Sequence, residues 1–206
     1  FAPPAGWNSS VRCALVGGGT VLSGGEVDTM VFDVTPSGSV TGPTMVDVVT
    51  AGVESNSARA VPGSSSGLGS VLVQSPGTIV VSTITPSRAT ITSGTSVPWT
   101  VAVTLTNNGQ ADVNLALGAA VQVNFQDDTT TPAFIVPGSL AGGGTLLSGG
   151  ETDQLLISLT TAGTYSSFGS KSITVDVDGT ELNSGVVTNG INTGSVTVQQ
   201  APDAAF

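Results

Sequence analysis

A block of nineteen residues occurs twice in this chain, and the two copies lie 125 positions apart. Residues 16–34 read VGGGTVLSGGEVDTMVFDV and residues 141–159 read AGGGTLLSGGETDQLLISL, with ten identical positions. The same offset relates GSVLVQ at residues 69–74 to GSVTVQ at residues 194–199. Because self-similarity at a fixed period is typical of modular arrays, the sequence predicts a repeating unit of about 125 residues.

The 206 residues hold one full period and part of another. Residues 78–117 open the second copy, whereas nothing before Phe1 supplies an equivalent for the first copy. We therefore predict two domains. Residues 1–77 form the C-terminal part of a repeat whose early strands are missing or donated by a neighbour, and residues 78–206 form a complete repeat. The expectation is either a piece of a longer array or a subunit that borrows strands from its neighbour.

Composition narrows the classes of partner. Only 9% of the residues are charged, against about 25% in an average soluble domain, and the abundant Val and Thr favour strands. The net charge of −10 argues against nucleic acid, which requires a basic surface, and against anionic lipid surfaces. The chain has no run of eighteen apolar residues, so we predict no membrane insertion. This composition is typical of an extracellular or cell-surface protein.

Cys13 is the only cysteine, so the chain cannot form an internal disulfide. The first interpretation is a small buried apolar side chain. The alternatives are an intermolecular disulfide or an exposed thiol.

Alternation of apolar and hydroxyl side chains predicts the strands. In residues 99–106, WTVAVTLT, the apolar residues take the odd positions, which is the period of a half-buried strand. Residues 107–109, NNG, then predict a turn. Further strands are predicted at residues 111–117, 121–125, 155–159, 172–177 and 195–198, with first-copy counterparts at 30–34, 45–49 and 70–73.

About seven short strands per period, separated by Gly, Pro, Asn and Ser turns, are typical of an antiparallel β-sandwich. The predicted fold class is all-β, with tandem antiparallel immunoglobulin-like β-sandwiches of which the first copy is incomplete. The cysteine pair of antibody domains is absent, so this prediction depends on the number and spacing of the strands.

Three segments resemble one family. They are Ile84-Thr85-Pro86, the Val101–Asn108 run that ends in Asn-Asn-Gly, and Leu147-Ser148-Gly149-Gly150-Glu151 before an alternating strand. This order is similar to that of the bacterial cell-adhesion-related immunoglobulin-like repeats. The resemblance implies a surface or secreted array whose modules act as spacers, adhesive units or polymer building blocks, with no catalytic site to carry over.

The inventory of reactive side chains is small. The chain has no histidine, which excludes triads and metal sites built on imidazole, and we predict that it is not an enzyme. Gly17-Gly18-Gly19-Thr20 lacks the lysine and the helix of a phosphate loop. Paired carboxylates occur at Glu26/Asp28, Glu151/Asp153, Asp127/Asp128 and Asp176/Asp178.

These carboxylate pairs have two interpretations. Residues i and i+2 of a strand project to one face, so a pair could share a cation or a proton. The alternative for Glu151 and Asp153 is a solvent-facing pair that protects a strand edge. Asp176-Val177-Asp178-Gly179 predicts a calcium site because Asp-x-Asp-Gly presents oxygen ligands on a sharp turn. The alternative there is an Asp-Gly hairpin turn without metal. No other cofactor is expected.

The leading functional hypothesis is a structural subunit or segment of an extracellular filament, stalk or surface layer. Its modules would associate head-to-tail with one another or with neighbouring repeats, through donor-strand complementation. The alternative is an adhesin or an accessory binding module of a larger secreted protein, with a glycan or a surface protein as its ligand.

The alternation predicts that Leu155 points into the core of the complete domain. Leu155→Asp should therefore unfold that domain, because it buries an unpaired charge. Chemical denaturation followed by circular dichroism tests this. A change in the free energy of unfolding within about 0.5 kcal/mol, as for an ordinary surface substitution, would mean that the strand is assigned to the wrong face.

Overall fold

The computed structural model describes residues 7–36, 41–94, 97–125, 134–159, 165 and 167–202. The chain divides into two compact units, Phe1–Gln74 and Ser75–Phe206. Residues 75–77, which the sequence analysis placed in the first domain, hydrogen-bond within the second unit. The carbonyl oxygen of Ser75 accepts from the backbone N–H groups of Gln110 at 3.2 Å and of Ala111 at 3.1 Å. Apart from one 3₁₀ turn, η1 (Gly118–Ala120), the elements are strands, which confirms the all-β class.

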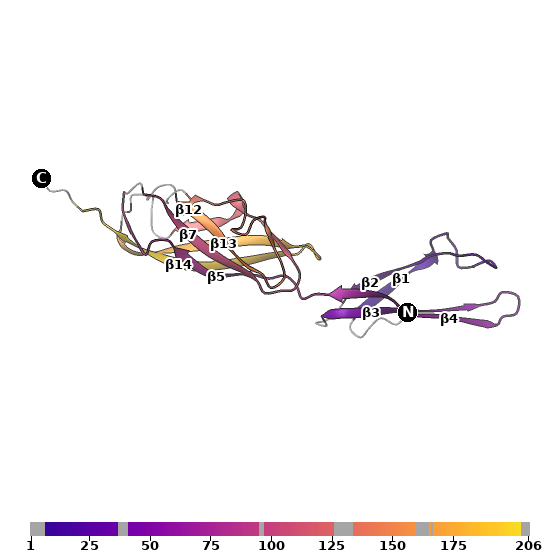
Figure 1. Ribbon diagram of the computed structural model, residues 1–206. Helices are drawn as coiled ribbons and strands as arrows, with labels where there is room; N and C mark the ends of the chain where they lie inside the picture. Colours follow the sequence, from indigo (N-terminus) through magenta and orange to yellow (C-terminus); the bar gives the residue numbers. More distant parts are fainter. Residues whose placement is uncertain are drawn as a thin grey trace. The chain divides into compact units, whose positions relative to one another are not determined.

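The second unit contains two sheets (Figure 1). Adjacent strands of the first sheet are antiparallel. β7 and β12 pair without interruption from Trp99 opposite Leu159 to Thr106 opposite Thr152. In spatial order, the strands are β10 (Phe134–Ile135), β12 (Thr152–Leu159), β7 (Trp99–Asn107) and β5 (Ile79–Pro86).

The second sheet is built around a long hairpin. In spatial order its strands are β11 (Leu146–Leu147), β8 (Val113–Leu115), β13 (Gly169–Glu181), β14 (Val187–Gln199) and β6 (Thr90–Thr92), and β9 (Gln122–Phe125) also pairs with β13. β6 runs parallel to β14, so the chain changes sheets between β5 and β6. This arrangement confirms the predicted antiparallel immunoglobulin-like sandwich.

The core lies between these two sheets and follows the predicted alternation. On β7 the side chains of Trp99, Val101, Val103 and Leu105 are buried, with partly exposed or exposed residues between them. β12 and β13 alternate in the same way, and Leu155 is fully buried. The other fully buried large side chains include Ile157, Leu159, Ile173, Val175 and Val177. Burial of each contributes about 1.5–3 kcal/mol relative to exposure.

The first unit contains two antiparallel ladders. β1 (Trp7–Leu15) pairs with β2 (Met30–Pro36), and β3 (Gly42–Val53) pairs with β4 (Ala60–Val73). No side chain described in this unit is buried. The described part of the unit therefore holds its strands by backbone pairing without an enclosed apolar core.

The ladders of the first unit match four strands of the second. Ser9 pairs with Val34 in β1–β2, and Phe134 pairs with Leu159 in β10–β12, which is the same register displaced by 125 residues. β3–β4 matches the β13–β14 hairpin. The described strands of the first copy thus correspond to β10, β12, β13 and β14.

Two local expectations were wrong, and one strand had not been predicted. Residues 7–15 form a strand for which the sequence gave no expectation, and of the predicted strand 111–117 only Val113–Leu115 is a strand. Asp178-Gly179 is not a turn, because β13 continues to Glu181. The glycine is explained by packing, since a Cβ at Gly179 would lie 2.6 Å from Val113 Cγ1 and 2.8 Å from Ile79 Cδ1.

Asn107, at the end of β7, joins four segments of the second unit. Its side chain is fully buried, and its Nδ2 donates to the carbonyl oxygens of Ala111 at 2.8 Å and Leu147 at 3.1 Å. Its Oδ1 accepts from the backbone N–H groups of Thr78 and Gly109, both at 3.0 Å. A side-chain amide has two donors and a carbonyl oxygen with two lone pairs, so all of its hydrogen-bonding capacity is used.

Asn107→Ala should lower the free energy of unfolding of the second unit by about 3 kcal/mol or more, because it leaves four backbone groups without their partner. Denaturant unfolding of the full chain measures this. Asn108→Ala is the matched control: Asn108 is exposed, and its substitution should change stability by less than about 0.5 kcal/mol. Equal effects of the two substitutions would contradict the role assigned to Asn107.

Candidate functional site

The repeated Gly-Gly-Gly segments form two acid-capped loops with the same hydrogen bonds. In the first unit the backbone N–H of Gly17 donates to both carboxylate oxygens of Asp28, at 3.1 Å each. In the second unit Gly142 donates to Asp153 at 3.2 and 3.1 Å. A Cβ at Gly17 or Gly142 would lie within 2.8 or 2.6 Å of the carboxylate. A side chain at either glycine would therefore displace the carboxylate from its present position.

The second acid of each loop also caps a backbone donor. Glu26 Oε2 accepts from Ser23 N–H at 2.7 Å, and Glu151 Oε2 accepts from Ser148 N–H at 2.7 Å. The pairs Glu26/Asp28 and Glu151/Asp153 thus satisfy separate backbone N–H groups, which otherwise need water or another acceptor. This arrangement explains why the repeat keeps acids at these positions, and it differs from the shared cation or proton considered from the sequence.

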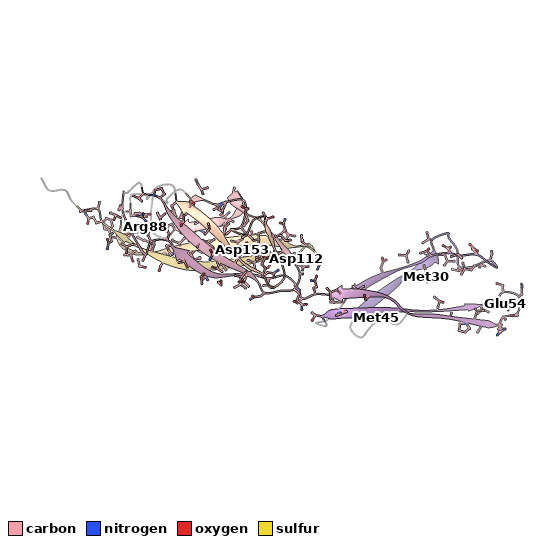
Figure 2. The ribbon with its side chains drawn as sticks, viewed as in Figure 1. Met30, Met45, Glu54, Arg88, Asp112 and Asp153 are labelled. Carbon is pink, nitrogen blue, oxygen red and sulfur yellow. The ribbon has the colours of Figure 1, made fainter. Side chains whose placement is uncertain are left out.

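A second repeated motif lies at the tip of each long hairpin, at Glu54 (Figure 2) and at Glu181. The backbone N–H of Glu54 donates to Arg59 O, and that of Glu181 donates to Val186 O, both at 2.9 Å. Ser184 Oγ donates to Glu181 Oε2 at 2.8 Å, and Ser57 bonds Glu54 in the same way. The sequence analysis missed this motif because its offset is 127 rather than 125 residues. ESNS at residues 54–57 and ELNS at residues 181–184 were the available signal.

An irregularity in β4 returns the offset from 127 at the hairpin tip to 125 at residues 69–74. In β3–β4, Val46 pairs with Gly69 and Val48 pairs with Ser65, so β4 contains two residues more than β3 between these pairs. The β13–β14 ladder has no such irregularity. The two hairpins also differ at one turn position, where Ala58 takes φ 54° and Gly185 takes φ 72°.

Asp176 and Asp178, the predicted calcium ligands, lie on one face of β13. Asn189 on β14 is opposite Asp178 in the ladder, and its Nδ2 donates to Asp178 Oδ1 at 2.9 Å and also to Asp176 Oδ1. An amide donor thus lies where the two carboxylates converge. Calcium takes six to eight oxygen ligands, and the described residues contain no group of three or more His, Cys, Asp or Glu side chains that could hold a metal ion.

Other candidate groups do not assemble into a site. Asp127 and Asp128 lie outside the described residues, as does the side chain of Cys13. A shallow open depression between η1, β9 and β10 is lined by residues including Gln122, Val123 and Phe134, without a charged side chain. In the described parts of the chain, no helix has the length and apolar composition needed to cross a bilayer.

The two units differ in the exposure of equivalent apolar side chains. Positions that are buried in the second unit are open to solvent in the first, even though the surrounding loops are the same. Met30 at the start of β2 is one of them (Figure 2). Leu22, Met30 and Val71 are 54%, 41% and 46% exposed, whereas their counterparts Leu147, Leu155 and Val196 are 0%, 0% and 2% exposed. We name these three first-unit residues the open face, because their counterparts belong to one apolar cluster in the second unit.

Comparisons with known proteins assign the chain to no family. No family model matches it, and no curated protein matches it. Among solved structures, the PapD-like (ASH) domain 7 of human CEP192 matches with 17% identity and a TM-score of 0.31, covering 59% of this chain and 87% of that one. AvmM, which catalyses macrocyclization in alchivemycin A biosynthesis, matches with 12% identity and a TM-score of 0.32, covering 60% and 92%.

A further match is to domains 4 and 5 of the S-layer protein SbsC, with 16% identity and a TM-score of 0.27, covering 97% of this chain and 78% of that one. At these levels of similarity the sandwich fold rests on the strand topology described above. Membership of the adhesion-related repeats stays a prediction.

Because the Asn189 amide lies between Asp176 and Asp178, we expect about 5 mM calcium to leave the melting temperature of the chain within about 1 °C, although it exceeds the roughly 10⁻³ M dissociation constants of weak extracellular calcium modules. Asn189→Asp replaces the amide donor by a third carboxylate and is the positive control. A calcium-dependent rise for the unmodified chain that Asp176→Asn removes would establish the calcium site.

Proposed function

We propose that this chain is a non-enzymatic structural segment of an extracellular filament, stalk or surface layer built from immunoglobulin-like repeats. One observation carries the proposal. The two units share their acid-capped loops and hairpin tips down to individual hydrogen bonds, yet the first unit leaves exposed the apolar positions that the second unit encloses. A module of this kind becomes complete only when further strands cover it.

The chemistry of the described residues supports a mechanical role. The acids that the repeat retains hold backbone N–H groups of their own loops, and Asp176 and Asp178 bond Asn189. The strands form long continuous ladders, of which β13–β14 pairs over twelve residue positions. Such ladders resist extension because their hydrogen bonds must break together. The low content of charge is compatible with close lateral packing outside the cell.

Assembly would proceed by donor-strand complementation between repeats. An exposed strand edge with an apolar face is a template for an added strand. Addition between unlike surfaces of successive modules is heterologous, and when the rotation does not close it generates an open filament. The partners are therefore other copies of the same repeat, in one chain or in neighbouring chains.

Antibodies against the second unit, applied to intact and to permeabilised cells of the source, test the location. We expect labelling of intact cells, and electron microscopy of the isolated protein should show regular fibres, stalks or layers. Labelling only after permeabilisation would contradict the proposal. Monodisperse particles that bind a glycan or a surface protein would favour the alternative, an adhesin or an accessory binding module.

A further inference from the structure

We propose that the open face of the first unit is the receiving site for one defined occupant, the opening half of a further copy of this repeat. This occupant is an antiparallel β segment of the sequence type found at Ile79–Leu115, which spans β5 to β8. The inference rests on the proposed modular function and adds the identity of the donor segment, its register and the residues that receive it.

The free edge of β2 sets the register of the donor. β12 pairs with β10 on one side and β7 on the other. β2 pairs with β1 in the β10 register, and among the described strands it has no second neighbour. The free edge of β2 is therefore the edge that corresponds to the β7 side. Since Leu155 pairs with Val103 in the second unit, Met30 would pair with the Val103 position of the donor.

Three glycines of the second unit pack closely against the segment Ile79–Leu115, and each has a glycine as its counterpart in the first unit. Gly149, Gly179 and Gly194 of the second unit cannot carry a Cβ. A Cβ would lie 2.1 Å from Gln110 O, 2.6 Å from Val113 Cγ1 and 2.7 Å from Ile84 O, respectively. All three of these crowding atoms belong to residues 79–115.

The first-unit counterparts of these glycines are Gly24, Gly52 and Gly69. The offset is 125 residues for Gly24 and Gly69 and 127 residues for Gly52, which lies in the hairpin. A Cβ at any of the three would meet nothing within 4 Å, and none has a positive φ. Neither crowding nor backbone conformation within the described unit requires glycine there. The close approach of a donor of the 79–115 type would require it at all three positions.

The donor also has the side chains that the open face needs. β7 presents Val101, Val103 and Leu105 on one side, where they are fully buried in the second unit. In the second unit these residues and Leu147, Leu155 and Val196 belong to one apolar cluster. Leu147, Leu155 and Val196 are the counterparts of the open face. The open face therefore consists of apolar side chains like those that pack with β7 in the second unit.

A fusion protein tests the inference. Residues 75–125 are placed directly before Phe1 of the full chain, so that eight residues separate the added Phe125 from Ser9, as eight residues separate Phe125 from Phe134, the counterpart of Ser9. We expect hydrogen exchange of the β2 amides, residues 30–35, to slow by about tenfold or more relative to the unmodified chain, because a paired strand opens less often. The control carries Val101→Asp and Val103→Asp in the added segment only, and its β2 amides should exchange as in the unmodified chain.

Substitution of the three first-unit glycines gives a second, independent test. The triple substitution Gly24→Ala, Gly52→Ala and Gly69→Ala should leave the exchange of β2 unchanged in the unmodified chain and abolish the protection in the fusion. No protection in the fusion, or protection that survives the three alanines, would overturn the inference. Either result leaves the antibody test of location unaffected, so failure of the donor assignment is distinguishable from failure of the structural role.

Discussion

The second unit depends on the buried amide of Asn107. β7 ends at this residue, and its side chain binds Thr78 just before β5, Gly109 and Ala111 in the segment that follows β7, and Leu147 at the end of β11. A buried polar group is costly unless its hydrogen bonds are made, so the four segments have one arrangement that satisfies it. Glycines at 77, 109 and 149 leave no room for a Cβ and permit the close backbone approach that these bonds need.

The first unit shows what remains when that junction is absent. Its acid-capped loop and its hairpin tip form the same local hydrogen bonds as in the second unit, because each motif is built from residues close in the sequence or across one ladder. The apolar side chains that those motifs position have no cover from β5 to β8. These motifs thus have the same local structure in both units, whereas Leu22, Met30 and Val71 are exposed and their second-unit counterparts are buried. This asymmetry links the fold to the proposed modular assembly.

The hydrogen-bond partners of the carboxylates could not be predicted from the sequence. The i, i+2 spacing correctly indicated that Asp176 and Asp178 share a face, but it could not reveal that Asn189 on the next strand donates to both. The same spacing at Glu151 and Asp153 concealed two separate backbone caps. Asp178-Gly179 has the composition of a turn, yet it continues β13, because the glycine accommodates Ile79 and Val113. In each case a partner distant in sequence decided the role of the residue.

The sequence by itself determined the repeat, the all-β class, and the inward face of β7 and β12. These properties follow from period-2 alternation and from self-similarity, both of which are local or periodic signals. Only the tertiary structure decided the pairing partners, the change of sheet between β5 and β6, and the function of the acids as loop caps. It also decided the exposure of the open face and the free space beside Gly24, Gly52 and Gly69. Those properties depend on which strands meet, and strand pairing joins residues whose separation along the chain leaves no periodic trace.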